Sequence, residues 1–85
     1  LTAREIEIET LITGLRLLEG VELTRFRTIL PHLEKCLPAL IREGLMARHK
    51  QRIFFTRSGS FVDELVFARL ISACQAPKRG QTRGA

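Results

Sequence analysis

Residues 45–56, LMARHKQRIFFT, decide the fold that this sequence predicts. Two β-prone runs, 45–49 and 52–56, flank the polar pair Lys50-Gln51, which is the pattern of a two-stranded hairpin. The pair lacks the Asn-Gly signature that would define the turn type. Helical periodicity precedes and follows this hairpin. We therefore predict a mainly α, winged-helix-like domain with three helices, a two-stranded wing and a long C-terminal helix.

The first helix is predicted from a capping box at residues 2–5, in which the Thr2 hydroxyl and the Glu5 carboxylate each accept a backbone N–H. Gly20 is expected to end this helix. Gly14 in its interior costs about 0.5–1 kcal/mol relative to alanine, which indicates that another element passes close by. Arg16 is expected to form an exposed ion pair with Glu9 or Glu19. The buried stripe consists of Ile8, Leu11, Ile12, Leu15 and Leu18.

Two more helices are predicted before the hairpin. A short one fits Glu22–Ile29, and its inner contacts would be Leu23, Phe26 and Leu30. The next lies between Pro31 and Gly44, and Pro38 is expected to kink or shorten it. Its buried stripe consists of Leu33, Leu37, Leu40 and Ile41.

The last predicted helix spans Arg57–Cys74, with Thr56 as its N-cap. It is apolar around nearly its whole circumference, which favours burial on more than one side. We therefore expect part of this surface to meet another region of a longer protein, or a second copy of the chain. The apolar positions are Phe61, Val62, Leu65, Val66, Phe67, Ala68, Leu70 and Ile71.

The net charge of +5 is unevenly distributed along the 85 residues. We predict a folded domain over residues 1–74 and a disordered basic tail over 75–85, which contains three basic residues and no acid. A nearly balanced folded domain is weak evidence for a nucleic-acid partner. No apolar run is long enough for a membrane span and no signal peptide is evident. Cys36 and Cys74 are 38 positions apart without a CxxC pattern, so a reduced, cytoplasmic setting is expected.

The sequence offers few groups for chemistry. His32 and Cys36 have an i, i+4 spacing, but no further ligand pattern accompanies them, so no metal site is predicted. No catalytic motif is present, and we expect no active site in these residues. The basic wing (Arg48, Lys50, Arg52 and Arg57) leaves a winged-helix DNA-binding module as the alternative function. Carboxylates on the preceding helix, Glu34 and Glu43, argue against that alternative. A third possibility is a domain that dimerises through its last helix.

Three stretches carry a resemblance to a known family: ETLITGLRLLEGV at 9–21, EGLM at 43–46, and FTRSG at 55–59 leading into FVD at 61–63. They resemble the C-terminal domain of oxygen-independent coproporphyrinogen III oxidase-like radical S-adenosylmethionine proteins, especially the heme chaperone branch. The GLRL..G element at this distance before the others is the more specific part. The chain departs from the family pattern at Phe55, where leucine is usual, and at the two prolines of the middle segment.

The resemblance implies a longer parent protein, which agrees with a first residue that is not methionine. In that family an N-terminal partial barrel binds a 4Fe-4S cluster and S-adenosylmethionine, and the C-terminal domain packs on it and helps shape the tetrapyrrole site. No cofactor is expected within the present chain, because the cluster cysteines are not in it. The resemblance makes Gly14 and Arg16 candidates for contact with the barrel or substrate, and an arginine suits a propionate group.

Overall fold

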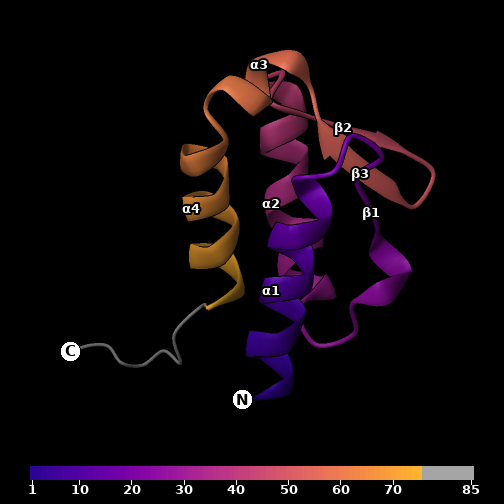
Figure 1. Cartoon of the computed structure of the whole chain (residues 1–85), viewed down its shortest axis with the longest axis vertical. Helices are drawn as coiled ribbons and strands as arrows, with labels where there is room; N and C mark the ends of the chain where they lie inside the picture. The colour runs from indigo at the N-terminus through magenta and orange to yellow at the C-terminus, as the bar shows by residue number, and fades with distance from the viewer. Residues whose placement is uncertain (76–85) are drawn as a thin grey trace.

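The computed structural model describes residues 1–75, which form a mainly helical domain with a small antiparallel sheet (Figure 1). Three longer helices, α1, α2 and α4, pack beside the sheet, and the short helix α3 lies at one end of the molecule. The elements in chain order are α1 (Ala3–Leu15), β1 (Val21–Glu22), the 3-10 helix η1 (Leu23–Arg25), α2 (Leu30–Arg42), β2 (Met46–His49), β3 (Arg52–Phe55), α3 (Arg57–Phe61) and α4 (Asp63–Cys74).

The predicted hairpin is confirmed as β2 and β3, joined through Lys50 and Gln51. Lys50 has φ of 58°, the left-handed conformation that lets so short a turn reverse the chain. The sheet has three strands rather than the predicted two, because β1 pairs antiparallel with β3 and gives the order β1-β3-β2. Val21 pairs with Ile53, and both side chains are buried.

The predicted second helix over Glu22–Ile29 is wrong. Its first residue pairs with β3, and the Leu23 amide donates a 2.6 Å hydrogen bond to the Gln51 carbonyl. Only the single turn η1 follows. Leu23 and Phe26 are nevertheless buried as predicted, since a three-residue spacing suits one 3-10 turn as well as an α-helix. The edge of β3 and the hairpin turn supply hydrogen-bond partners for the backbone at 22–23, and the apolar spacing of the sequence does not reveal such partners.

The capping box of α1 is confirmed: Thr2 Oγ1 accepts from the Glu5 amide at 3.1 Å, and Glu5 Oε1 accepts from the Thr2 amide at 2.8 Å. The helix ends at Leu15 rather than at Gly20, so Leu18 falls in the following turn and is 99% exposed instead of buried. Gly20, with φ of 76°, lies against the backbone of β3, where a side chain would strike the Ile53 carbonyl. The chain must leave the helix early in order to bring β1 to that edge.

The helix α2 begins with Pro31 in its first turn and runs through Pro38 without a break. The predicted effect of Pro38 is therefore wrong. Pro38 is exposed, so the carbonyl that loses its helical partner can face solvent. Gly44, with φ of 80°, follows the last turn as predicted. The stripe of Leu33, Leu37 and Leu40 is buried, whereas Ile41 is 37% exposed.

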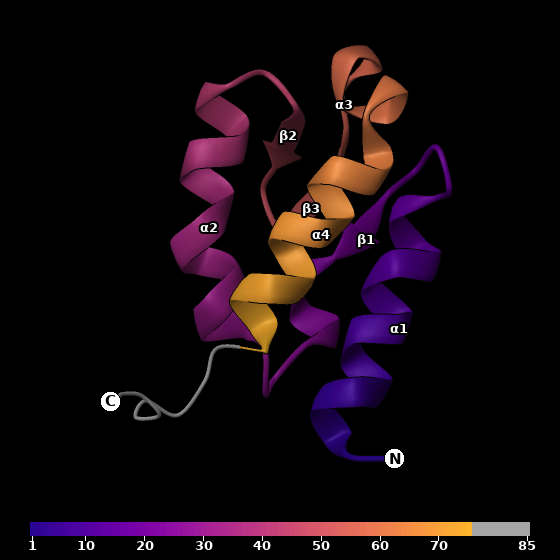
Figure 2. The ribbon, with the colours of Figure 1, turned by 90° about the vertical axis from the view of Figure 1, so that its left-hand side faces the viewer.

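The last helix is not continuous as predicted, because it is divided into α3 and α4 at Val62, which has φ of −120° and ψ of 37°. The N-cap is confirmed: Thr56 Oγ1 accepts from the Gly59 amide at 3.0 Å. Gly59 lies directly on the Leu45 carbonyl, where a Cβ atom would come within 1.8 Å. The short helix is thus fixed against the start of the wing, and α4 takes a different direction to reach α1 and α2 (Figure 2).

One apolar core joins the three longer helices to the sheet. It contains residues of every long element, and within residues 1–75 no polar or charged side chain is buried in it. None of the helices in the described part of the chain has the length and hydropathy needed to cross a membrane. Of the predicted tail only Gln75 is described; residues 76–85 lie outside the described structure. The core consists of Ile8, Leu11, Leu15, Val21, Leu23, Phe26, Ile29, Leu33, Leu37, Leu40, Met46, Ile53, Val66, Phe67, Leu70 and Cys74.

Candidate functional site

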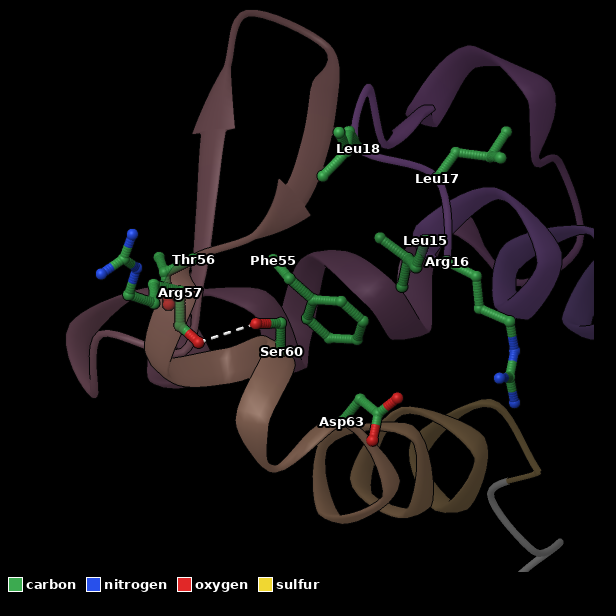
Figure 3. Close-up of a pocket in the computed structure, with 9 residues that line it drawn as sticks. All are labelled: Leu15, Arg16, Leu17, Leu18, Phe55, Thr56, Arg57, Ser60 and Asp63. Atoms are coloured by element: carbon green, nitrogen blue, oxygen red, sulfur yellow. Dashed lines mark hydrogen bonds between the residues drawn. The ribbon is translucent and has the colours of Figure 1, made fainter.

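A groove lies between the turn that follows α1 and the junction of β3, α3 and α4 (Figure 3). Its volume is about 500 Å³, within the range of small-molecule and peptide sites. Leu15 and Phe55 form its apolar interior, while three charged side chains line its rim. We call it the main groove; its lining residues are Leu15, Arg16, Leu17, Leu18, Phe55, Thr56, Arg57, Ser60 and Asp63.

The main groove is built from two of the three stretches that carry the family resemblance. Residues 15–18 come from the first stretch and residues 55–63 from the third. They are about forty positions apart in the sequence and meet because β1 and β3 pair. The tertiary structure therefore gathers the motif residues at one surface.

Arg16 lies at the rim of this groove, where it stacks on an aromatic pair. Its Cζ atom is 5.2 Å from the centroid of the Phe67 ring, the geometry of a cation–π contact. Phe67 in turn meets the Phe55 ring edge to face, with the centroids 5.3 Å apart and the planes at 69°. The ion pair expected with Glu9 or Glu19 is not formed: among residues 1–75, Arg16 makes no salt bridge. The guanidinium group is oriented by the ring and keeps its donors available.

Gly14 occupies a different position from Arg16 and does not line the main groove. It is buried against β1, where a Cβ atom would come within 2.8 Å of Val21 Cβ. The expectation that another element passes close to this glycine is confirmed, and that element is β1. Its direct role is packing inside the domain, whereas a contact with another domain stays a prediction.

The second and third family-like stretches form a single joint below the groove. Thr56 Oγ1 donates a 2.6 Å hydrogen bond to the Gly44 carbonyl while it accepts from the Gly59 amide. The Thr56 amide donates to the Leu45 carbonyl at 3.2 Å. These bonds tie the end of α2 to the start of α3, so the motif residues Gly44, Leu45, Thr56 and Gly59 hold the groove wall in place.

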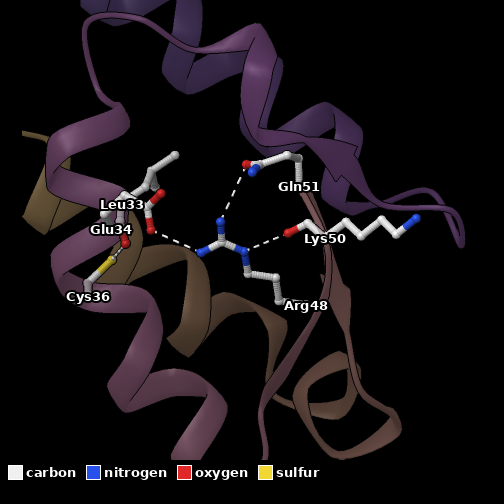
Figure 4. Close-up of polar contacts among 6 residues, drawn as sticks. All are labelled: Leu33, Glu34, Cys36, Arg48, Lys50 and Gln51. Atoms are coloured by element: carbon white, nitrogen blue, oxygen red, sulfur yellow. Dashed lines mark hydrogen bonds and ion pairs between the residues drawn. The ribbon is translucent and has the colours of Figure 1, made fainter.

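The basic wing is largely occupied by contacts within the domain. Arg48 forms a 3.0 Å ion pair with Glu34 of α2 and also donates to the Lys50 carbonyl and the Gln51 side chain (Figure 4). Arg52 pairs with Glu22 at 2.9 Å. Two of the four wing cations are therefore neutralised by carboxylates, which disfavours a role in gripping phosphates.

The two cysteines and His32 do not assemble into a metal site. The Cys36 thiol points to the Leu33 carbonyl, 3.6 Å away, and burial raises its pKa (Figure 4). Burial, with a smaller contribution from Cys36, raises the pKa of Cys74 to about 11. Both thiols are therefore protonated at neutral pH and poor ligands. Residues 1–75 contain no cluster of three or more His, Cys, Asp or Glu side chains able to hold a metal ion.

Sequence reasoning did not identify the role of Glu7. Glu7 accepts hydrogen bonds of 3.0–3.2 Å from the backbone amides of Arg27, Thr28 and Ile29, just before α2. Burial acts to raise the pKa of Glu7, but these amide bonds together outweigh it and lower the pKa. The only signal in the sequence was a helix without a capping residue, since Ile29 at the N-cap offers no side-chain acceptor.

A comparison with protein-family models now identifies the family. Residues 1–62 match the model of the HemN C-terminal domain. The chain belongs to this family. The match contains α1, the sheet and α3, and it ends one residue before α4. No curated protein and no solved structure matches the chain, so the winged-helix likeness stays a prediction.

Proposed function

We propose that this chain is the accessory C-terminal domain of a larger oxygen-independent coproporphyrinogen III oxidase-like protein. In this role it packs on a radical S-adenosylmethionine barrel of the same parent chain and helps shape the tetrapyrrole site of that barrel. The observation that supports the proposal most directly is the family match over residues 1–62, together with the gathering of its motif residues at the main groove. A cytoplasmic location goes with this role.

The proposed contact of Arg16 with a tetrapyrrole rests on the geometry of the main groove. A porphyrin is flat and apolar and bears carboxylates at its edge. The apolar interior at Leu15 and Phe55 suits the ring, and the guanidinium of Arg16 at the rim suits a propionate through two parallel hydrogen bonds. Phe67 limits the orientations of Arg16, which lowers the entropy lost on binding.

The iron–sulfur cluster that the family implies, and on which S-adenosylmethionine binds there, does not fit the residues of this chain. Cluster iron is held by cysteine thiolates, and Cys74 is a buried thiol with a pKa of about 11. Cys36 is half-buried and engaged with the backbone. We therefore assign both cofactors to the barrel of the parent, and no chemical step to this domain.

The role of Arg16 is tested by titrating heme and coproporphyrin into the full-length parent and following absorbance and fluorescence. Arg16→Ala is expected to weaken tetrapyrrole binding about tenfold, the effect of losing one charge-assisted pair, while Arg16→Lys retains part of it. Arg25→Ala is the matched control, because Arg25 is exposed and lies outside the main groove. Unchanged tetrapyrrole affinity in Arg16→Ala would exclude the contact.

The role in packing on the barrel is tested separately. Limited proteolysis and thermal unfolding of the parent with and without residues 1–85 measure whether the domain stabilises the barrel. We expect the barrel alone to be cut faster and to unfold at a lower temperature, because the apolar surface that the domain covers becomes exposed. Equal stability of the two forms would contradict the packing role.

A further inference from the structure

The outer face of α1 carries aliphatic side chains that the domain leaves uncovered. Ile6 is 50% exposed, and Leu17, in the turn that continues α1, is 57% exposed. The opposite face of the helix is buried in the core. A surface helix ordinarily has a polar outer face, whereas a helix that is apolar on opposite sides is buried on both of them. The outer face of α1 therefore has the composition of a contact surface.

Ile6 and Leu17 border an open hollow of about 350 Å³ that runs along α1. Leu17 also touches the edge of the main groove, but Figure 3 shows its side chain turned away from that groove. The middle of the hollow is lined by small residues, and Thr10 Oγ1 donates a 3.0 Å hydrogen bond to the Ile6 carbonyl, which satisfies its hydroxyl within the helix. Positions 6, 10, 13 and 17 are spaced by four, three and four residues, as in a helix that packs along another helix. We call this surface the α1 seam; its lining residues are Ile6, Glu9, Thr10, Thr13, Gly14, Leu17 and Arg25.

The α1 seam has one opposite charge on each side. At 100° per residue, Glu9 lies on one side of the seam and Gly14, which contacts β1, lies on the other. Arg25 follows β1 in η1, so it stands on the side of Gly14 (Figure 1). The chain runs beside α1 from β1 to residues 27–29, which Glu7 binds, and this places Arg25 about level with Glu9. Neither Glu9 nor Arg25 forms an ion pair within residues 1–75.

From this arrangement we infer that the α1 seam binds a second copy of the chain, with the two α1 helices parallel about a two-fold axis that runs between them. This symmetry sets the left side of each helix against the right side of the other, so Glu9 of each copy meets Arg25 of the second copy. An antiparallel pair brings like charges together, so the charges select the parallel arrangement. Ile6 and Leu17 each pack on their counterpart, and the small residues between them let the helices approach closely.

The dimer is expected to be weak. The α1 seam is about three helical turns long, so the contact is smaller than the roughly 800 Å² per partner of a standard interface. We expect a dissociation constant of about 10–100 µM, and therefore a monomer at low micromolar concentration. The seam and the two charges beside it are separate from the groove residue Arg16, so this inference does not depend on the tetrapyrrole contact or on the barrel.

The test is sedimentation velocity of the 85-residue chain from about 5 µM to about 1 mM, where the average mass should rise from that of a monomer to that of a dimer. Ile6→Ser and Leu17→Ser should each weaken the dimer several-fold. Glu9→Arg alone and Arg25→Glu alone should each weaken it at least tenfold, because both contacts of the pair become repulsive. An equal mixture of Glu9→Arg and Arg25→Glu should dimerise again, because in the mixed dimer each substituted side chain meets an opposite charge.

Two controls match the test variants. Glu64→Arg reverses an exposed charge and Leu65→Ser removes an exposed leucine, both on α4 and outside the seam, so both should dimerise as the unmodified chain does. Circular dichroism of each variant confirms that it is folded. A chain that stays monomeric at the highest concentration, or a mixture of the two charge variants that stays monomeric, would overturn the inference. So would a dimer that Leu65→Ser abolishes, because that dimer forms through α4.

Discussion

Glu7 links α1 to the segment that precedes α2, and its removal tests how much this link stabilises the fold. The carboxylate extends from α1 to three backbone amides at 27–29, which precede α2 and have no capping side chain of their own. Replacement by alanine leaves these donors to water alone. The loss of a helix N-cap costs about 0.5–2 kcal/mol, and hydrogen bonds to a charged group lie at the upper end. We expect Glu7→Ala to lower the free energy of unfolding by about 2 kcal/mol and Glu7→Gln by about 1 kcal/mol.

The assay is urea and thermal denaturation followed by circular dichroism. For a domain of this size, 1 kcal/mol corresponds to a shift in melting temperature of about 4–8 °C, so Glu7→Ala should melt about 8–16 °C lower. Glu9→Ala is the matched control, since Glu9 is an exposed carboxylate of the same helix that makes no hydrogen bond or ion pair within residues 1–75. It should change the free energy of unfolding by less than about 0.5 kcal/mol.

The stabilisation by Glu7 should also depend on pH, in a direction that its pKa shift sets. The pKa of Glu7 is lowered in the folded protein from an ordinary value of 4.5, because the amide bonds outweigh burial. The stabilisation is therefore fully present above pH 4.5 and is lost as the pH falls through the folded pKa. The difference in unfolding free energy between the unmodified chain and Glu7→Gln should shrink on acidification. A difference that is constant between pH 7 and the acid limb, or a Glu7→Ala variant as stable as Glu9→Ala, would refute the reasoning.

Substitutions at three further positions test the groove wall and the joint below it. Gly59→Ala should unfold the domain or cost at least about 3 kcal/mol, because the new Cβ atom meets the Leu45 carbonyl at 1.8 Å; wild-type stability in urea would contradict the packing described. Thr56→Val keeps the volume but removes the bonds to the Gly44 carbonyl and the Gly59 amide, so thermal denaturation should show a loss of about 2 kcal/mol, and Thr56→Ser should recover most of it. Leu18→Ser should alter the unfolding free energy by less than about 0.5 kcal/mol, since the side chain is 99% exposed. A large loss of stability would instead indicate that Leu18 is buried, as expected for a first helix that continues to Gly20.

The features that local sequence chemistry controls were predicted correctly. The capping box at Thr2 and Glu5, the hairpin around Lys50 and the N-cap at Thr56 each depend on residues within a few positions of one another. The prediction that Leu33, Leu37 and Leu40 form the buried face of their helix was also correct. Such features depend little on the rest of the fold, because the residues that interact are close together in the sequence.

The errors fall where a partner distant in the sequence decides the local structure. The segment after Gly20 has the apolar spacing of a helix but becomes β1, since the exposed edge of β3 offers it hydrogen bonds. The same pairing ends α1 early and places Leu17 and Leu18 on the surface. The last helix is divided at Val62, since α3 is fixed against the Leu45 backbone at Gly59 while α4 packs on α1 and α2.

The candidate site divides in the same way. Arg16 was identified from the sequence through its motif, but its position over Phe67, at the rim of a groove shared with Arg57, depends on the pairing of β1 with β3. Glu7 was not identified at all, because its role as a cap is set by amides twenty or more positions away. The sequence by itself determined the caps at Thr2 and Thr56, the hairpin around Lys50, the buried face of α2 and which family the chain resembles. Only the tertiary structure decided the strand β1, the end of α1, the division of the last helix at Val62 and which side chains share a surface, because those outcomes depend on contacts between residues far apart in the chain.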